Sequence, residues 1–438
     1  MAYTSNNTDL ARFRHMARGP LCVVLGTCFL LVIALAAALG SILTRQKTSA
    51  PIHGGDLSAD IHKPNSNLTT KLLPIRNHYQ LPALTIARGN ATTFVSASVG
   101  VRKEGSPIPA LSTDIYHLGS LTKAMTATLL ALLVQNNTTN LSWTSTLPQL
   151  LPGFTISPAH QNTTLQDLTS HRSGIVDSFN DSTFLSLYTL PAKHGRWLLA
   201  NESLLHPPTQ PRGSFTYANT NYILAGMILD LHSPSRSAET FFQSHLLHPL
   251  HMSTAGWGPC PEKSNTSIGN PWPHTPSPSG PIPLTGFPNW EKDNPPAFNT
   301  AGRMHMSPRD CNAFLQVHLS AVLGQRHNTL HLSPAQFTHL HTAYPSTNTS
   351  DPGNGYTYGG LIRRNFTVDV ERISTLGKTP VPEYVLAHDG SNTLNFGYAL
   401  LDSYAGEAYM ALTNVGGSEA DVGVQEVIVG MRNGTLIF

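Results

Sequence analysis

The hydrophobic pattern of this 438-residue chain separates one continuous apolar stretch from a long body of shorter runs. Residues 21–43 are almost wholly apolar, and the stretch is long enough for a helix that crosses a bilayer. Residues 45 to about 75 are rich in Pro, Ser, Asn and Thr without a hydrophobic period, which is typical of a flexible stalk. We therefore expect a cytosolic tail at 1–18, a transmembrane signal anchor at 19–44, a stalk at 45–75 and one large domain at 76–438.

Within the large domain, short apolar runs at both ends enclose a helical middle. Runs at 84–87 and 94–101 predict two strands joined by a turn at Gly89-Asn90, and the apolar run 124–134 predicts a helix. Residues 164–230 are predicted to be mostly helical, with breaks around Gly174, Pro191 and 207–213, and with a helical apolar set at 222–229.

The C-terminal end repeats the strand pattern and then closes with a helix. Runs at 384–387, 396–401 and 408–412 predict three antiparallel strands punctuated by Gly390 and Gly406, and 420–431 predicts a helix. Strands at both ends favour an α+β fold, in which both ends of the domain form one antiparallel sheet flanked by helices, beside a large and mostly helical subdomain.

A Pro- and Gly-rich stretch at 256–296 interrupts these elements and carries Trp257, Trp272 and Trp290. An irregular segment this long in a compact domain is usually functional or disordered. The tryptophans favour a folded loop that forms one wall of a cleft. The alternative is a surface insertion that its tryptophans hold against the body.

Composition and charge exclude some classes of partner and place the chain. Charged residues make up only 12% of the chain and its net charge is +2, so nothing favours nucleic acid or an acidic partner. The arginines before the apolar stretch favour a cytosolic N-terminus only slightly. A cleavable signal peptide is the alternative, because Ala34-Leu35-Ala36 resembles a cleavage site. The domain is then extracellular or luminal, either membrane-anchored or secreted.

Sequons and cysteines agree with that compartment. A glycoprotein is predicted, because Asn-x-Ser/Thr triplets begin at Asn67, Asn90, Asn136, Asn137, Asn140, Asn162, Asn180, Asn201, Asn265, Asn348, Asn365 and Asn433. Cys22 and Cys28 lie in the apolar stretch, so only Cys260 and Cys311 remain in the domain. In an oxidising compartment these two could form a disulfide or remain as two thiols.

The candidate chemistry begins with Ser120-Leu121-Thr122-Lys123, at the start of the helix predicted over 124–134. Ser120 and Lys123 lie on one helical face, where the lysine, once neutral, can take the serine proton. The N-terminus of that helix adds partial positive charge where an oxyanion would form.

Two further motifs follow in order. In Tyr217-Ala218-Asn219, the tyrosine could relay a proton, with its pKa lowered by the nearby ammonium, and the asparagine could hold Lys123 and a substrate carbonyl. His388-Asp389-Gly390-Ser391 is predicted to form a turn after the strand at 384–387. The Ser391 and Ser120 amides could form an oxyanion hole, Gly390 would let a substrate approach, and His388 could donate or relay a proton.

Together these motifs resemble the serine hydrolases related to class C β-lactamases and penicillin-binding peptidases. Residues 115–119, which precede Ser120, also resemble the family, and 165–174 (LQDLTSHRSG) resembles its LLTHTSG segment. Asp293-Asn294-Pro295-Pro296, Ala301-Gly302 and His305-Met306-Ser307 resemble its Pro-Ala-Gly region. The resemblance spans about residues 80–435.

The resemblance implies Ser120 as the nucleophile, Lys123 and Tyr217 as the general-base pair, Asn219 as an orienting group and His388 where many relatives have lysine. It also implies an acyl-enzyme, no metal and no cofactor. Asp389 stands where many relatives have threonine and should repel a carboxylate unless strand alternation points it away.

The sequence therefore favours a membrane-anchored serine hydrolase or acyltransferase that acts on a small neutral ester or amide. The alternative is a catalytically inactive glycosylated binding ectodomain of the same fold. Histidines at 318, 327, 331, 339 and 341 suggest a metal site, but their spacing favours a solvated helical face.

Overall fold

The computed structural model describes residues 66–136, 138–261, 268–285, 292–325, 329–345, 351, 353–365 and 384–438. Residues 56–179 and 186–438 belong to one compact unit, and residues 1–55 with 180–185 to another. In the second unit, 180–185 are the described residues, and 181–185 lie in helix α7 (Asp181–Ser186). Everything below concerns the first unit.

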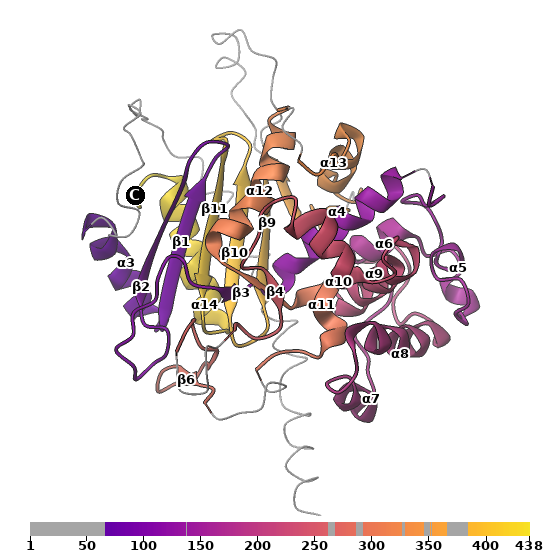
Figure 1. Cartoon of the computed structure of the whole chain (residues 1–438), viewed down its shortest axis with the longest axis horizontal. Helices are drawn as coiled ribbons and strands as arrows, with labels where there is room; N and C mark the ends of the chain where they lie inside the picture. Colours follow the sequence, from indigo (N-terminus) through magenta and orange to yellow (C-terminus); the bar gives the residue numbers. More distant parts are fainter. Residues whose placement is uncertain are drawn as a thin grey trace, which may run out of the picture. The chain divides into compact units, whose positions relative to one another are not determined.

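The unit combines eleven described strands with helices on either side of a sheet (Figure 1). The strands are β1 (Ala83–Gly89), β2 (Phe94–Gly100), β3 (Tyr116–His117), β4 (Gly256–Trp257), β5 (His274–Thr275), β6 (Ile282–Pro283), β7 (Met304–Met306), β8 (Ile362–Asn365), β9 (Tyr384–Ser391), β10 (Phe396–Asp402) and β11 (Glu407–Thr413). The α-helices are α3 (Ser66–His78), α4 (Thr122–Gln135), α5 (Leu147–Leu150), α6 (Leu165–Thr169), α8 (Ala192–Leu205), α9 (Asn219–His232), α10 (Ala238–Phe242), α11 (Asn299–Gly302), α12 (Pro308–Val322), α13 (Pro334–His341) and α14 (Ser418–Arg432).

The main sheet has six antiparallel strands in the order β2-β1-β11-β10-β9-β8. Strand β1 pairs with β11, from Leu84 opposite Thr413 to Gly89 opposite Ala408, so the two ends of the domain meet in the middle of the sheet. The expected α+β architecture is thereby confirmed.

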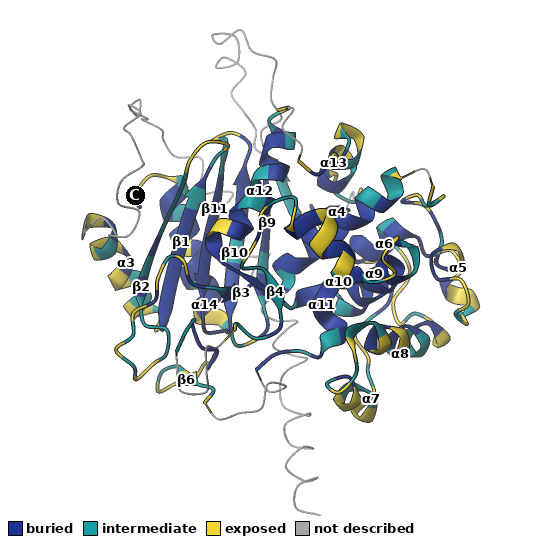
Figure 2. Cartoon of the chain, in the orientation of Figure 1, coloured by how far each residue is buried: buried dark blue, intermediate teal, exposed yellow. Residues whose placement is uncertain are grey.

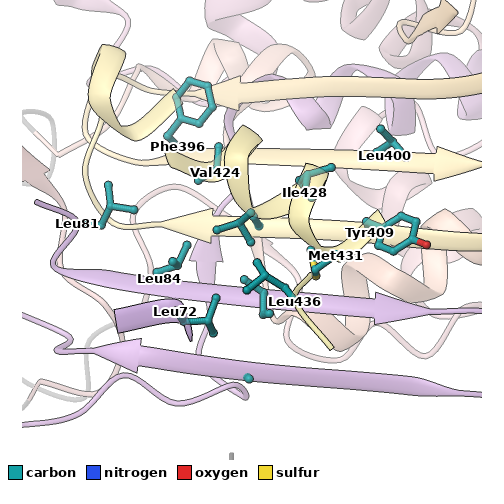
Figure 3. Packing of buried hydrophobic residues seen from close by; sticks show 14 of the residues in the cluster. Leu72, Leu81, Leu84, Phe396, Leu400, Tyr409, Val424, Ile428, Met431 and Leu436 are labelled. Carbon is teal, nitrogen blue, oxygen red and sulfur yellow. The ribbon is translucent and has the colours of Figure 1, made fainter. Parts of the chain in front are cut away.

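Helices cover both faces of this sheet. In Figure 1, α12 lies in front of the strands, and α14 and α3 pack on the other face. Helix α14 presents Val424, Val427 and Ile428 to a buried cluster that includes Leu84 from β1 and Leu400 from β10 (Figure 3). Fully burying one such aliphatic side chain stabilises the fold by about 1.5–3 kcal/mol.

The predicted stalk is wrong over its last residues, because 66–75 lie in helix α3. Leu68 and Leu72 are one helical turn apart and both are buried in the cluster under the sheet. The segment is otherwise rich in polar residues, so these two leucines alone did not show a helical period. The predicted tail, anchor and remaining stalk at 1–65 lie outside the described residues.

Strand β9 also differs from the prediction, because it continues through His388 and Gly390 to Ser391. Gly390 pairs with Gly397 of β10, so glycine here continues the strand and does not end it. The turn follows at 392–395, where the side chain of Asn392 accepts hydrogen bonds from the amides of Leu394 and Asn395.

The helical part lies beside the sheet, and its helices α4 and α9 are mostly buried (Figure 2). Helices α4 and α9 confirm the apolar runs predicted at 124–134 and 222–229. A small sheet in the order β3-β7-β4 lies at the entry to α4, where Tyr116 pairs with Met306.

The histidines predicted on a solvated helical face include a buried pair. His318 Nδ1 lies 2.9 Å from His341 Nε2, and His318 Nε2 lies 3.1 Å from Thr128 Oγ1. Both rings are buried, and burial lowers the pKa of each, so the pair joins α12, α13 and α4 as neutral rings. No group of three or more His, Cys, Asp or Glu side chains in the described ranges is arranged to hold a metal ion.

Two other predictions concern cysteines and the membrane. Cys260 and Cys311 are both free thiols, so the structure decides against the disulfide. Among the residues described, no helix is both long and apolar enough to cross a membrane. The anchor predicted at 19–44 lies outside the described residues.

Candidate active site

Ser120 lies in a single 3₁₀ turn, η1 (Gly119–Leu121), that leads directly into α4. Gly119 has φ +52°, a left-handed conformation that glycine adopts without strain. Leu118 on one side is held by a 2.8 Å hydrogen bond from its amide to the Met304 carbonyl. The turn therefore presents Ser120, which is half-buried, at the N-terminus of a buried helix.

Lys123 lies one turn further on, is fully buried and has three hydrogen-bond partners. Its Nζ is 2.9 Å from Ser120 Oγ, 2.9 Å from Asn219 Oδ1 and 2.7 Å from the Ala301 carbonyl oxygen. The two carbonyl oxygens can only accept hydrogen bonds. A neutral amine that donates its two hydrogens to them has its lone pair left for the hydroxyl of Ser120.

The electrostatics of the site make this neutral form accessible. Burial lowers the pKa of Lys123 to about 7, although the carboxylates of Asp177 and Asp389 act in the opposite direction. At neutral pH a large fraction of Lys123 is therefore unprotonated and able to accept the Ser120 proton.

Tyr217 lies against the same two residues, but its pKa shifts in the direction opposite to the prediction. Lys123 Nζ is 4.8 Å from the centre of its ring, and its side chain hydrogen-bonds with that of Ser120. The prediction of a lowered pKa is wrong: burial raises the pKa of Tyr217 well above its ordinary value, and Asp389 adds to this, although the Ser120 hydrogen bond opposes it. Tyr217 is thus a phenol that can donate or relay a proton, and Lys123 is the better base.

Asn219 begins helix α9, and a residue missed by the sequence reasoning orients it. Asp177 accepts hydrogen bonds from the Asn219 backbone amide at 2.9 Å and from Asn219 Nδ2 at 3.0 Å. The other oxygen of Asp177 accepts from the amide and the hydroxyl of Thr220, both at 2.8 Å. Because Nδ2 is held by Asp177, Asn219 Oδ1 is directed toward Lys123.

We expect Asp177→Ala to lower kcat about tenfold, since one lost positioning hydrogen bond of about 1.4 kcal/mol corresponds to that factor. It should also move the acidic limb of the pH–rate profile to lower pH, because the Asp177 charge raises the pKa of Lys123. Glu419→Ala, which removes an exposed acid from the first turn of α14, is the control. A pH profile that does not differ between the two variants would contradict this role.

His388 lies on β9 with its ring toward the tyrosines. Its ring centre is 6.4 Å from that of Tyr217, and Nε2 lies 3.2 Å from the hydroxyl of Tyr356. Nδ1 is hydrogen-bonded to the backbone carbonyl oxygen of Asp389, which can only accept, so Nδ1 carries the ring proton. Nε2 is then unprotonated and accepts a hydrogen bond from the Tyr356 hydroxyl. Burial lowers the pKa of His388, which makes it a neutral ring where many relatives place a lysine.

The backbones that would form an oxyanion hole are in direct contact. A Cβ built on Gly119 would lie 2.3 Å from the Ser391 nitrogen, and one built on Gly390 would lie 2.9 Å from the Ser120 nitrogen. Two glycines therefore let the Ser120 and Ser391 amides approach each other without an intervening side chain. Strand β8 pairs with β9 only at 384–387, so 388–391 lie beyond that pairing.

Asp389 lies on the other face of the sheet. It pairs across the strands with Tyr398, which packs against the cluster under α14, and paired residues share a face. His388 and Gly390 alternate with it toward Ser120. Asp389 therefore points away from the site, and the repulsion predicted for an acid that lines the site does not apply. Its charge acts from a longer distance and raises the pKa of Lys123 and Tyr217.

The α+β fold that holds these residues together is of the serine-hydrolase class. The chain belongs to the β-lactamase family, whose model matches residues 77–421.

Solved structures have the same fold at low sequence identity. The octameric penicillin-binding protein homologue from Pyrococcus abyssi is 21% identical, with a TM-score of 0.63 over 84% of this chain and 77% of its own. The β-lactamase from Sulfitobacter sp. EE-36 is 18% identical, with a TM-score of 0.63 over 84% and 98%. The D-amino acid amidase from Ochrobactrum anthropi SV3 is 19% identical, with a TM-score of 0.61 over 84% and 100%.

A curated relative, the unguisins hydrolase ungD of Aspergillus violaceofuscus, is 24% identical over 185 residues. The alignment covers 40% of this chain and 31% of that protein, which is under a third of its length. Both the family and these neighbours support a hydrolase.

Proposed function

We propose that this protein hydrolyses small ester or amide substrates through an acyl-enzyme on Ser120. Lys123 takes the Ser120 proton as the hydroxyl attacks the carbonyl carbon, and the amides of Ser120 and Ser391 stabilise the oxyanion. Tyr217 then donates its hydroxyl proton to the leaving group and takes in its place the proton that Lys123 received from Ser120. Water then attacks the acyl-enzyme by the same steps in reverse order, which releases the acid and regenerates Ser120.

The observation that carries this proposal is the set of three partners of Lys123 Nζ. Two obligate acceptors, Asn219 Oδ1 and the Ala301 carbonyl, leave the third position of the nitrogen to Ser120 Oγ. A buried lysine that served only to neutralise a carboxylate would have that carboxylate among its partners, as Arg196 has Asp230 at 2.8 Å.

Labelling with a fluorophosphonate tests the proposal. The wild-type protein should form a covalent adduct on Ser120, and Ser120→Ala should form none. Ser244→Ala is a suitable control, because Ser244 Oγ lies 2.7 Å from His245 Nδ1 and is a second serine beside a base. Equal labelling of wild type and Ser120→Ala would indicate a binding domain of the same fold that does not turn over substrate.

The charges around the site favour uncharged substrates. His388 is neutral where a cation would attract a carboxylate, and Asp389 contributes a negative charge through the sheet. We expect Asp389→Asn to raise kcat/KM for mono-p-nitrophenyl succinate relative to p-nitrophenyl acetate about fivefold, which corresponds to about 1 kcal/mol of repulsion. An unchanged ratio would show that the Asp389 charge does not select substrates.

We propose that the domain is luminal or extracellular and is anchored by residues 19–44. The sequon asparagines Asn67, Asn140, Asn162 and Asn433 are exposed, as glycan attachment requires. An endoglycosidase should increase the gel mobility of the protein from secretory cells, and alkaline carbonate should leave it in the membrane pellet. Release into the supernatant would favour a cleaved signal peptide.

A further inference from the structure

Asp293 has a fully buried carboxylate that lies outside the three motifs, in the segment before the turn η5 (Pro296–Phe298). Four groups donate hydrogen bonds to it. They are His117 Nε2 at 3.1 Å and Arg303 Nε at 3.1 Å to Oδ2, and the Asn294 amide at 2.8 Å and Asn392 Nδ2 at 3.3 Å to Oδ1. A buried carboxylate is stable only when it is satisfied in this way.

The first connection leads to the Ser120 turn. The amide of Gly119 donates a 3.2 Å hydrogen bond to His117 Nδ1, so this nitrogen carries no proton and Nε2 carries the one that Asp293 accepts. Asp293 thereby fixes the tautomer of His117, and His117 fixes the Leu118–Gly119 peptide, one residue before the Ser120 amide. His117 itself is almost fully buried on β3 and has little freedom to turn.

The second connection leads to the other proposed oxyanion donor. Asn392 follows Ser391 directly, and its Nδ2 is bonded to Asp293 while its Oδ1 closes the β9–β10 turn. A third connection runs through Arg303, two residues after Ala301, whose carbonyl holds Lys123 Nζ.

We propose that Asp293 is a positioning residue that ties the Ser120 turn and the end of β9 to one carboxylate, and so holds the two oxyanion amides at their working separation. This inference rests on the proposed hydrolase function. His117 and Arg303 hold the pKa of Asp293 below its usual value although burial alone would raise it, so the carboxylate stays ionised in its role.

Asp293→Asn tests the proposal. Both oxygens of the carboxylate accept hydrogen bonds, so whichever one the amide nitrogen replaces, that nitrogen would face groups that donate hydrogen bonds there. If it faces His117 Nε2–H, the histidine must move its proton to Nδ1, where the Gly119 amide already donates. With p-nitrophenyl acetate we expect kcat to fall about 100-fold with KM within about threefold, as for loss of one oxyanion-hole donor. The ¹⁵N resonances of His117, assigned by their loss in His117→Asn, should shift away from the Nε2-protonated pattern.

Asp230→Asn is the matched control for general destabilisation. Asp230 is equally buried and bound to Arg196 at 2.8 and 3.0 Å, but it lies near the C-terminal end of α9. It should lower the melting temperature while leaving kcat per folded molecule unchanged. Asn392→Ala should also lower kcat, but less than Asp293→Asn does, because it removes only the connection between Asp293 and the end of β9.

The outcomes separate this inference from the proposed function. An active wild type whose Asp293→Asn variant keeps kcat within threefold overturns the positioning role. If kcat falls and the His117 spectrum does not change, the amide nitrogen faces Asn294 and Asn392, and the loss of activity runs through the end of β9. A wild type without Ser120-dependent turnover contradicts the proposed function. In that case a change in the His117 resonances between wild type and Asp293→Asn would still show that Asp293 acts on the Ser120 turn.

Discussion

Lys123→Arg is expected to lower kcat about 10³-fold, the range found for removal of a positioned general base. Lysine can act here because burial lowers its pKa to about 7 and its free amine can accept the Ser120 proton. A guanidinium stays charged at all accessible pH values, so the variant cannot accept the Ser120 proton. Stopped-flow measurement of the acylation burst with p-nitrophenyl acetate separates this step from deacylation.

The pH dependence of the wild type should report the same group. The reactive form of Lys123 is unprotonated, so the acylation rate should be low below pH 7, rise through about pH 7 and level off above it. Lys71→Arg, an exposed lysine bonded to the Thr435 carbonyl, is the control and should behave as wild type. A wild-type profile without an ionisation near pH 7, or a Lys123→Arg variant with kcat within threefold, would argue against Lys123 as the base.

The order of strands and helices could be predicted from the sequence because each depends on local periodicity. Short apolar runs marked β1, β2, β10 and β11, and the meeting of both ends of the domain in one sheet followed from strands at both ends. Helix α3 was missed because only Leu68 and Leu72 are fully buried in a polar segment, too few to show a period.

The site was predictable as far as its linear motifs reach. Ser120, Lys123, Asn219 and His388 are recognisable from the spacing and order of their motifs, and the structure brings them together. Asp177 and Asp293 are single acids in loops, and no local pattern marks a residue whose partners lie far along the chain. The raised pKa of Tyr217 was also out of reach, because it depends on burial by the folded chain more than on the lysine beside it.

Gly390→Ala is the second substitution expected to have a large effect, because the site has no room for a methyl group at this position. A Cβ there would lie 2.0 Å from the Leu118 carbonyl oxygen and 2.9 Å from the nitrogens of Ser120 and Leu121. All three contacts are backbone atoms, of the turn η1 or of Leu118 directly before it, so no side chain can rotate away, and Leu118 is itself hydrogen-bonded to Met304. Gly390→Ala must push β9 and the Ser120 turn apart, which should lower kcat about 10²- to 10³-fold by separating the oxyanion amides and destabilise the fold by about 1–3 kcal/mol.

Gly397→Ala is the matched control, because Gly397 is the partner of Gly390 on β10. Its Cβ would meet the Leu412 Cδ2 methyl at 2.7 Å, a side-chain atom that can move. Both variants should therefore lower the midpoint of urea unfolding, but only Gly390→Ala should lose turnover per folded molecule. Equal kcat losses in the two variants would mean that strand packing in general, and not the approach of β9 to Ser120, controls the reaction.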